Sequence, residues 1–76
     1  MNNLFILETA LEQIEAEIST DITKVKLLLD DPSIAPENSD AVYEVHEILH
    51  HLANHITAKE TAETLLQKFK ETKTDD

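Results

Sequence analysis

Three observations predict an all-α fold for this chain. It contains no glycine and only two prolines, so tight β-hairpin turns, which need residues at positive φ, would be hard to build. Residues with high helix propensity make up much of the sequence. Apolar residues recur at steps of three and four along most of it. We therefore expect a small helical bundle in which a long first helix packs against two shorter helices, or a helical hairpin that dimerises into a four-helix-like bundle.

The first predicted helix spans residues 3–30. At about 100° per residue its apolar residues fall within a strip roughly 80° wide on one side. No glycine or proline interrupts the segment, and Asn2 or Asn3 can serve as its N-cap. The strip needs apolar cover along its whole length, which the rest of the chain or a second copy must supply. It consists of Leu4, Leu7, Leu11, Ile14, Ile18, Ile22, Val25 and Leu29.

The size of the chain favours an additional apolar contact outside this strip. Seventy-six residues form one domain near the lower limit at which a single core suffices, and no cysteine is present to form a disulfide. Phe5, Ile6 and Leu27 lie off the strip. A monomer this small has little material to cover a second face, so these residues favour a dimer or a partner-binding surface.

The loop and the second helix follow from local signals. Pro32 disfavours the helical conformation at Asp31 and so ends the first helix. We predict a loop over residues 31–38, after which Asn38 or Ser39 caps the second helix.

The apolar pattern then changes direction, which predicts a third helix. The apolar residues of 39–56 share one side, but those that follow would be rotated by roughly 120° if the helix continued. The segment from Thr57 to Glu60 matches a capping box. We therefore predict a break at Thr57, a helix over 58–71 and a frayed tail over 72–76. The alternative is one long helix whose halves face different neighbours.

Composition also bears on location. The absence of cysteine fits a reducing compartment. The apolar run near the N-terminus has no basic residue before it and is soon broken by Glu8 and Glu12, so neither a signal peptide nor a membrane span is predicted. We expect a cytoplasmic protein that does not bind membranes.

The charge of the chain predicts the kind of partner. Sixteen acidic residues face six lysines and no arginine, for a formal charge of −10. So few cations argue against direct binding of DNA or RNA, whereas a basic protein surface would be attracted. Eleven of the acids lie in residues 1–56, and Tyr43 among them is either an interface anchor or a half-buried core residue. The predicted partner-binding residues are Glu8, Glu12, Glu15, Asp40, Tyr43, Glu44 and Glu47.

These features predict a small, acidic, non-enzymatic regulator or inhibitor that docks its acidic helices on a basic, nucleic-acid-binding partner surface. In outline the chain resembles small acidic helical proteins of phages and mobile elements that inhibit host enzymes or act as anti-repressors. The alternative is a structural homodimer with an assembly or scaffolding role, which resembles the small plasmid RNA-modulator bundle but lacks its basic RNA-binding face.

One histidine pattern suggests metal chemistry. His46, Glu47 and His50 form an H-E-x-x-H pattern that resembles the zincin metallopeptidases, in which the histidines would be zinc ligands and the glutamate the general base. In the extended metzincin pattern a third histidine would stand where this chain has Ile56. Glu47 and His50 also match the Glu-x-x-His element of ferritin-like carboxylate bundles. We expect a solvated polar face here and no cofactor, with His46 and His50 as the metal candidates.

No other constellation predicts catalysis. Cysteine is absent, serine and threonine stand where caps and loops use them, and there is no glycine-rich phosphate loop. His51 and His55 lie near Glu44 and Glu47 in sequence and are candidates for groups that titrate near neutral pH. We therefore predict that the chain is not an enzyme.

Overall fold

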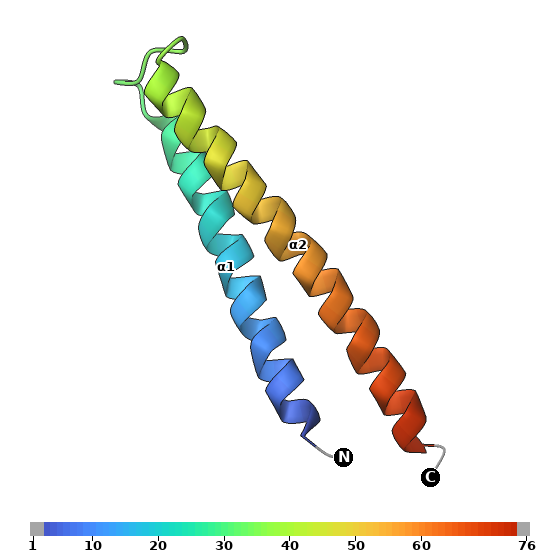
Figure 1. Ribbon diagram of the computed structural model, residues 1–76. Coiled ribbons are helices and arrows are strands. Elements are labelled where there is room, and N and C mark those ends of the chain that lie inside the picture. Colours follow the sequence, from blue (N-terminus) through green and yellow to red (C-terminus); the bar gives the residue numbers. More distant parts are fainter. Residues whose placement is uncertain (1–2, 75–76) are drawn as a thin grey trace.

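The chain folds as a hairpin of two long helices. The computed structural model describes the backbone of residues 3–74 and the side chains of residues 3–71. Helix α1 (Leu4–Asp30) and helix α2 (Ser39–Thr74) run antiparallel and pack against each other (Figure 1). The described chain contains helices and no strand, so the all-α prediction is confirmed. The Cα atoms extend over 60 × 14 × 12 Å, which makes the hairpin a rod.

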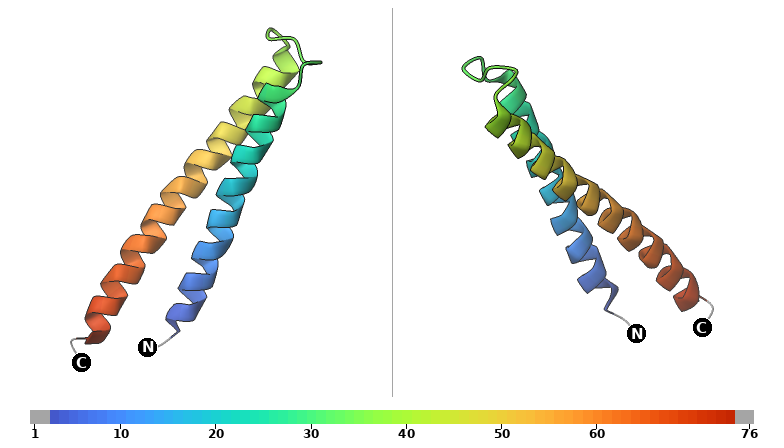
Figure 2. Two further views of the ribbon diagram at one scale, coloured as in Figure 1. Left: turned by 180° about the vertical axis from the view of Figure 1, so that it is seen from behind. Right: turned by 45° about the horizontal axis from the view of Figure 1, so that its top comes forward.

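The two ends of the rod differ. The connection closes one end, here called the loop end, and both chain termini lie at the other, here called the open end (Figure 1). The helix axes lie close together near the loop end and diverge toward the open end in all three views (Figure 2). Side chains on the facing sides of the helices therefore bridge a wider separation at the open end.

The predicted third helix is not a separate element. Helix α2 is continuous from Ser39 to Thr74, so the predicted break at Thr57 is wrong. The residues of the capping-box pattern lie inside the helix and do not cap a helix start. The backbone carbonyl of Thr57 accepts a hydrogen bond from the Thr61 hydroxyl at 2.9 Å. The helical backbone also passes the predicted limit of 71, while residues 75–76 of the predicted tail lie outside the described residues.

A seven-residue repeat explains why no break is needed. The residues that face the other helix, here called the seam, are buried or half-buried and alternate at steps of three and four along both helices. This spacing averages 3.5 residues per turn, as in a coiled coil. The seam continues through Thr57. What changes there is the side of the seam on which the flanking apolar residues lie: Ile56 lies on one side and Leu65 on the other. The seam consists of Leu4, Leu7, Leu11, Ile14, Ile18, Asp21, Val25 and Leu28 in α1 and Ala41, Val45, Ile48, Leu52, His55, Lys59, Ala62 and Leu66 in α2.

The same repeat corrects part of the predicted strip in α1. Ile22 and Leu29 were expected to face the core, but they are 52% and 72% exposed. Asp21 and Leu28 take the seam positions instead. A straight helix with 3.6 residues per turn drifts by about 20° per seven residues relative to the seam, so the error grows along α1.

Turns and caps at the loop end follow the sequence closely. The connection covers residues 31–38 as predicted. Pro32 and Pro36 each occupy the second position of a turn, which suits their fixed φ, and no described residue has positive φ. Asn38 caps α2, since its Oδ1 accepts a hydrogen bond from the Ala41 backbone N–H at 3.0 Å.

The side chain of Asp31 stabilises the first of these turns, which contains Pro32. Its Oδ1 accepts hydrogen bonds from the hydroxyl of Ser33 at 2.7 Å and from the backbone N–H of Ser33 at 2.9 Å. Both bonds favour the ionised carboxylate and hold the pKa of Asp31 below its ordinary value. At the other end of α1, the N-cap residue Asn3 makes no side-chain capping bond, and Asn2 lies outside the described residues.

Candidate functional site

The structure separates the predicted partner-binding residues into two groups. Glu8, Glu12 and Glu15 lie in the N-terminal half of α1, which is its open-end half (Figure 1). Opposite them on α2 is Lys59, whose Nζ lies 3.8 Å from Glu15 Oε2. Glu47 precedes Lys59 by twelve residues of continuous helix, or about 18 Å. All seven residues are exposed, but they do not form one surface. The loop-end group is Asp40, Tyr43, Glu44 and Glu47.

The open-end group gains carboxylates from α2. Lys59 Nζ lies between Glu15 and Glu63, whose Oε2 is 3.9 Å away, so both glutamates flank the seam on the same side. Neighbours three and four residues along each helix extend this surface. Three lysines of α2 lie among or beside these carboxylates at the open end: Lys59, Lys70 by its place in the repeat, and Lys68, which lines a shallow hollow together with Glu60 and Glu63. We call this set the acidic surface: Glu8, Glu12, Glu15, Glu60 and Glu63.

Sequence reasoning missed the two glutamates from α2. It ended the second helix at residue 56, and nothing in the pattern showed which part of α2 would lie beside the start of α1. The seven-residue repeat, extended through Thr57, would have placed Glu63 and Glu15 on the same side of an antiparallel pair.

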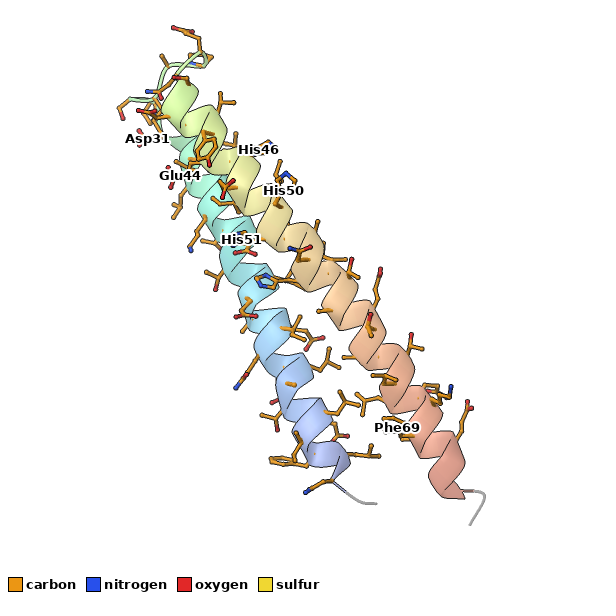
Figure 3. All side chains as sticks on the ribbon, in the orientation of Figure 1. Asp31, Glu44, His46, His50, His51 and Phe69 are labelled. Atoms are coloured by element: carbon orange, nitrogen blue, oxygen red, sulfur yellow. The ribbon has the colours of Figure 1, made fainter. Side chains whose placement is uncertain are left out.

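The loop-end group surrounds an exposed aromatic cluster. Tyr43 is 64% exposed, so it is not a half-buried core residue. Its ring stacks on His46 with centroids 6.3 Å apart, and His46 meets His50 edge-on at 4.6 Å. Figure 3 shows His46 and His50 on the side of α2 that faces away from α1. These contacts hold the three rings as a row along the outside of α2.

The metal-binding resemblance finds little geometric support here. His46, Glu47 and His50 are all exposed on α2. Within the described residues, no group of three or more His, Asp or Glu side chains is placed to hold a metal ion. A zincin site needs three protein ligands and an open position in a cleft, and this helix surface brings two imidazoles together.

A buried polar pair lies in the middle of the seam and was not predicted. Asp21 is 8% exposed, and its Oδ2 lies 2.9 Å from Nδ1 of His55 on α2. Glu17 Oε1 lies 3.6 Å from the Nε2 of the same ring. From its place in the sequence, His55 was expected near Glu44 and Glu47 of its own helix. In the structure its ring lies instead beside the carboxylates of Asp21 and Glu17 on α1.

An exposed apolar surface lies on the same face of the rod as the acidic surface, but in the half nearer the loop end. Its five side chains, 41% to 72% exposed, flank the seam near the loop end. A shallow groove of about 280 Å³ runs between the helices, lined by several of them together with Val25 and Leu52. Lys26 and Asp30 also line this groove. We call this set the apolar surface: Ile22, Leu29, Val42, Leu49 and Ile56.

One face of the rod is thus divided by its chemistry, with the apolar surface toward the loop end and the acidic surface toward the open end. No helix in the described part of the chain is long and apolar enough to cross a membrane. Comparison with protein-family models, curated proteins and solved structures gives no match for this chain.

Proposed function

We propose that this chain is a non-enzymatic protein-binding protein that docks its acidic surface on the basic, nucleic-acid-binding surface of a partner and so regulates or inhibits that partner. The observation that carries the proposal is the gathering of five exposed carboxylates on one side of the open end, beside Lys59, Lys68 and Lys70. The formal charge of −10 adds a long-range attraction to any basic surface.

The spacing of the carboxylates suits such a partner. Glu8, Glu12 and Glu15 follow one another at steps of four and three on α1, so they form a row that is about 10 Å long. Nucleic-acid-binding surfaces present lysine and arginine side chains along the path of the phosphate backbone. A row of carboxylates can contact several of these cations at once, in competition with nucleic acid.

The loop-end residues Asp40, Tyr43, Glu44 and Glu47 have a different place in this proposal. They lie in the other half of the rod, so a compact basic site that contacts the acidic surface does not reach them. They stay predicted contacts for a partner with a long groove. The cytoplasmic location and a phage or mobile-element origin also stay predictions, the first resting on the absence of cysteine.

Affinity capture at two salt concentrations tests the docking. The immobilised chain is exposed to cell lysate, and the captured protein is then titrated against wild type and against the triple variant Glu8→Gln, Glu12→Gln, Glu15→Gln. Three exposed ion pairs at about 0.5 kcal/mol each predict roughly tenfold weaker binding. Binding by wild type should also fall steeply with salt.

A second triple variant at the loop end is the matched control. Asp40→Asn, Glu44→Gln and Glu47→Gln remove the same three charges from exposed positions, and we expect them to weaken binding less. Equal losses in both triple variants would show that net charge alone attracts the partner, and salt-independent capture would contradict electrostatic docking.

The second candidate function is the structural homodimer with an assembly or scaffolding role. The apolar surface favours it, because monomeric proteins seldom leave several large aliphatic side chains exposed side by side.

A further inference from the structure

We infer that the apolar surface is the contact between two copies of this chain, which pair antiparallel over their loop-end halves while their acidic surfaces project in opposite directions. The inference gives the homodimer candidate a definite geometry. It uses different residues from the acidic docking, so either proposal can fail without the other.

The packing of a single hairpin is sparse, which calls for additional cover. Among the described side chains, Ala62 and Leu66 are the buried apolar ones, at 6% and 9% exposure, and Asp21 is the buried polar one at 8%. The other apolar seam residues are only half-buried. A helix buries its apolar stripe against other elements, and in a four-helix bundle each helix does so against more than one neighbour. Two layers of two helices would meet this requirement.

The sequence pattern near the loop end is that of a bundle helix. A two-stranded coiled coil needs apolar residues at the seam alone, whereas helices of a four-helix bundle carry a further apolar residue beside the seam in each repeat. Ile22 and Leu29 on α1 are seven residues apart, and Val42, Leu49 and Ile56 on α2 repeat at the same interval. In an antiparallel pair these positions lie on one side of the seam, and the groove between them confirms it for Ile22, Leu29 and Leu49.

Charge indicates that a second copy covers this surface. The groove lining contains two charged side chains, Lys26 and Asp30, and they already pair with each other at 2.9 Å. A basic partner would find no excess of carboxylates there, and a molecule with a formal charge of −10 can approach its own copy with least repulsion at this place. The groove volume of about 280 Å³ suits inserted aliphatic side chains.

The acidic surface fixes the arrangement of the two copies. Pairing along the full length would set carboxylates against the partner's carboxylates or against its apolar surface, and both are unfavourable. An antiparallel pair centred on Leu49, the midpoint of the apolar row on α2, avoids both. From Leu49 to Thr74 is 25 residues of helix, or about 37 Å, so the dimer extends over about 75 Å along α2. A pair overlapping along its full length would extend over about 60 Å, as one hairpin does.

The contact area predicts a dimer of moderate affinity. The five side chains and the groove amount to an apolar patch of roughly 400–500 Å², within the range of the largest apolar patches that monomers expose. With its rim the patch approaches the lower limit of a specific interface, where each partner contributes about 600 Å². We therefore expect dissociation in the micromolar range.

Sedimentation equilibrium of the full chain from about 1 to 500 μM tests the association. We expect a concentration-dependent shift from the chain mass of 8.6 kDa to twice that value. Leu29→Glu should weaken the dimer at least thirtyfold, and its side chain is so exposed that the hairpin itself does not depend on it. Leu27→Glu is the matched control: it adds the same charge at a 65% exposed leucine that lies about 160° away around α1.

The outcomes are distinct. A chain that stays monomeric at 500 μM overturns the inference, and so does a dimer that Leu27→Glu weakens as much as Leu29→Glu. Far-ultraviolet circular dichroism of each variant confirms that the helices persist. The triple variant at Glu8, Glu12 and Glu15 should dimerise as well as wild type or slightly better. Because the same variant should weaken docking to a basic partner, a failure of dimerisation and a failure of docking can be told apart.

Two further measurements test the arrangement. Leu49→Cys introduces the sole thiol of the chain, and oxidation should link two copies across the symmetry axis, whereas Leu27→Cys should not link them. X-ray scattering of the dimer should give a maximum dimension about 15 Å greater than full-length overlap would. A shorter particle, or failure of the position-49 thiols to join, contradicts the antiparallel, partly overlapped pair.

Discussion

Replacement of the polar pair in the seam is the most informative perturbation of the hairpin itself. Asp21 and His55 occupy positions where the repeat would place apolar residues, between the layers of Ile18 and Val25 on α1. We expect a double-mutant cycle with Asp21→Ala and His55→Ala to show a favourable coupling energy, and the double replacement by leucine to be more stable than wild type.

The magnitudes follow from the geometry. A hydrogen bond to a charged group contributes about 1.5–3 kcal/mol when it is well buried. The His55 side chain is 27% exposed and also faces Glu17 at 3.6 Å, so solvent and a second carboxylate replace part of what Asp21 provides. We therefore expect a coupling energy of about 1–2 kcal/mol. Two leucines in place of the pair should stabilise the hairpin by about 1–3 kcal/mol, because the desolvation of the polar groups is avoided.

Urea denaturation followed by circular dichroism measures both quantities. All variants are compared at one protein concentration, since dimerisation adds concentration-dependent stability. A coupling energy below about 0.3 kcal/mol would show that the pair contributes nothing beyond its separate residues. If the double leucine variant proves less stable than wild type, the assumption that the polar pair lowers stability relative to an apolar seam is wrong.

Two further predictions concern α2 and the loop. Ala58→Pro should destabilise the hairpin by about 3 kcal/mol in urea denaturation, because α2 is continuous there; a helix that began at Thr57 would tolerate it, as we expect of Ser39→Pro at the real start of α2. Asp31→Ala removes the acceptor of both Ser33 bonds and should lower the Tm at pH 7. Because the pKa of Asp31 is lowered from its ordinary value of 3.8, this stabilisation is present above about pH 4 and is lost as the pH falls through the lowered pKa, so the difference between the two Tm values should shrink as the pH is lowered below about 4. A difference that stays unchanged throughout that acid titration would contradict the assignment.

Local chemistry made the helix ends of the loop predictable. Pro32 excludes the helical conformation before it, and Asn38 supplies the acceptor that α2 needs at its start, so the limits of residues 30 and 39 follow from the sequence. Neither signal depends on how the helices pack. The start of α1 is less well marked, since Asn3 stands at the N-cap without a capping bond.

The register of the seam was harder to predict because polar residues occupy it. Asp21, His55 and Lys59 lie between the helices, and a search for apolar residues passes over all three. With His55 and Lys59 omitted, Ile56 on one side of the seam and Leu65 on the other look like two separate apolar faces. The apparent rotation at Thr57 is therefore a change in the flanking residues and not in the path of the helix.

The candidate surfaces depend on information that periodicity does not contain. The carboxylates of α1 were identifiable from charge alone, but their neighbours Glu60 and Glu63 become so only when the antiparallel alignment is known. The apolar surface was hidden for the opposite reason, because Ile22 and Leu29 had been assigned to the core. Their exposure follows from the seven-residue repeat of the seam, from which a straight 3.6-residue helix drifts.

The polar residues at the centre of the seam also affect how the hairpin opens. Asp21, His55 and Lys59 interrupt the apolar contacts near the midpoint of both helices, so separation of the helix ends can spread inward to this point without disturbing the contacts beyond it. Amide hydrogen exchange should then resolve two cooperative units, with faster exchange toward the termini. The polar residues of the seam would then mark the boundary between these two units.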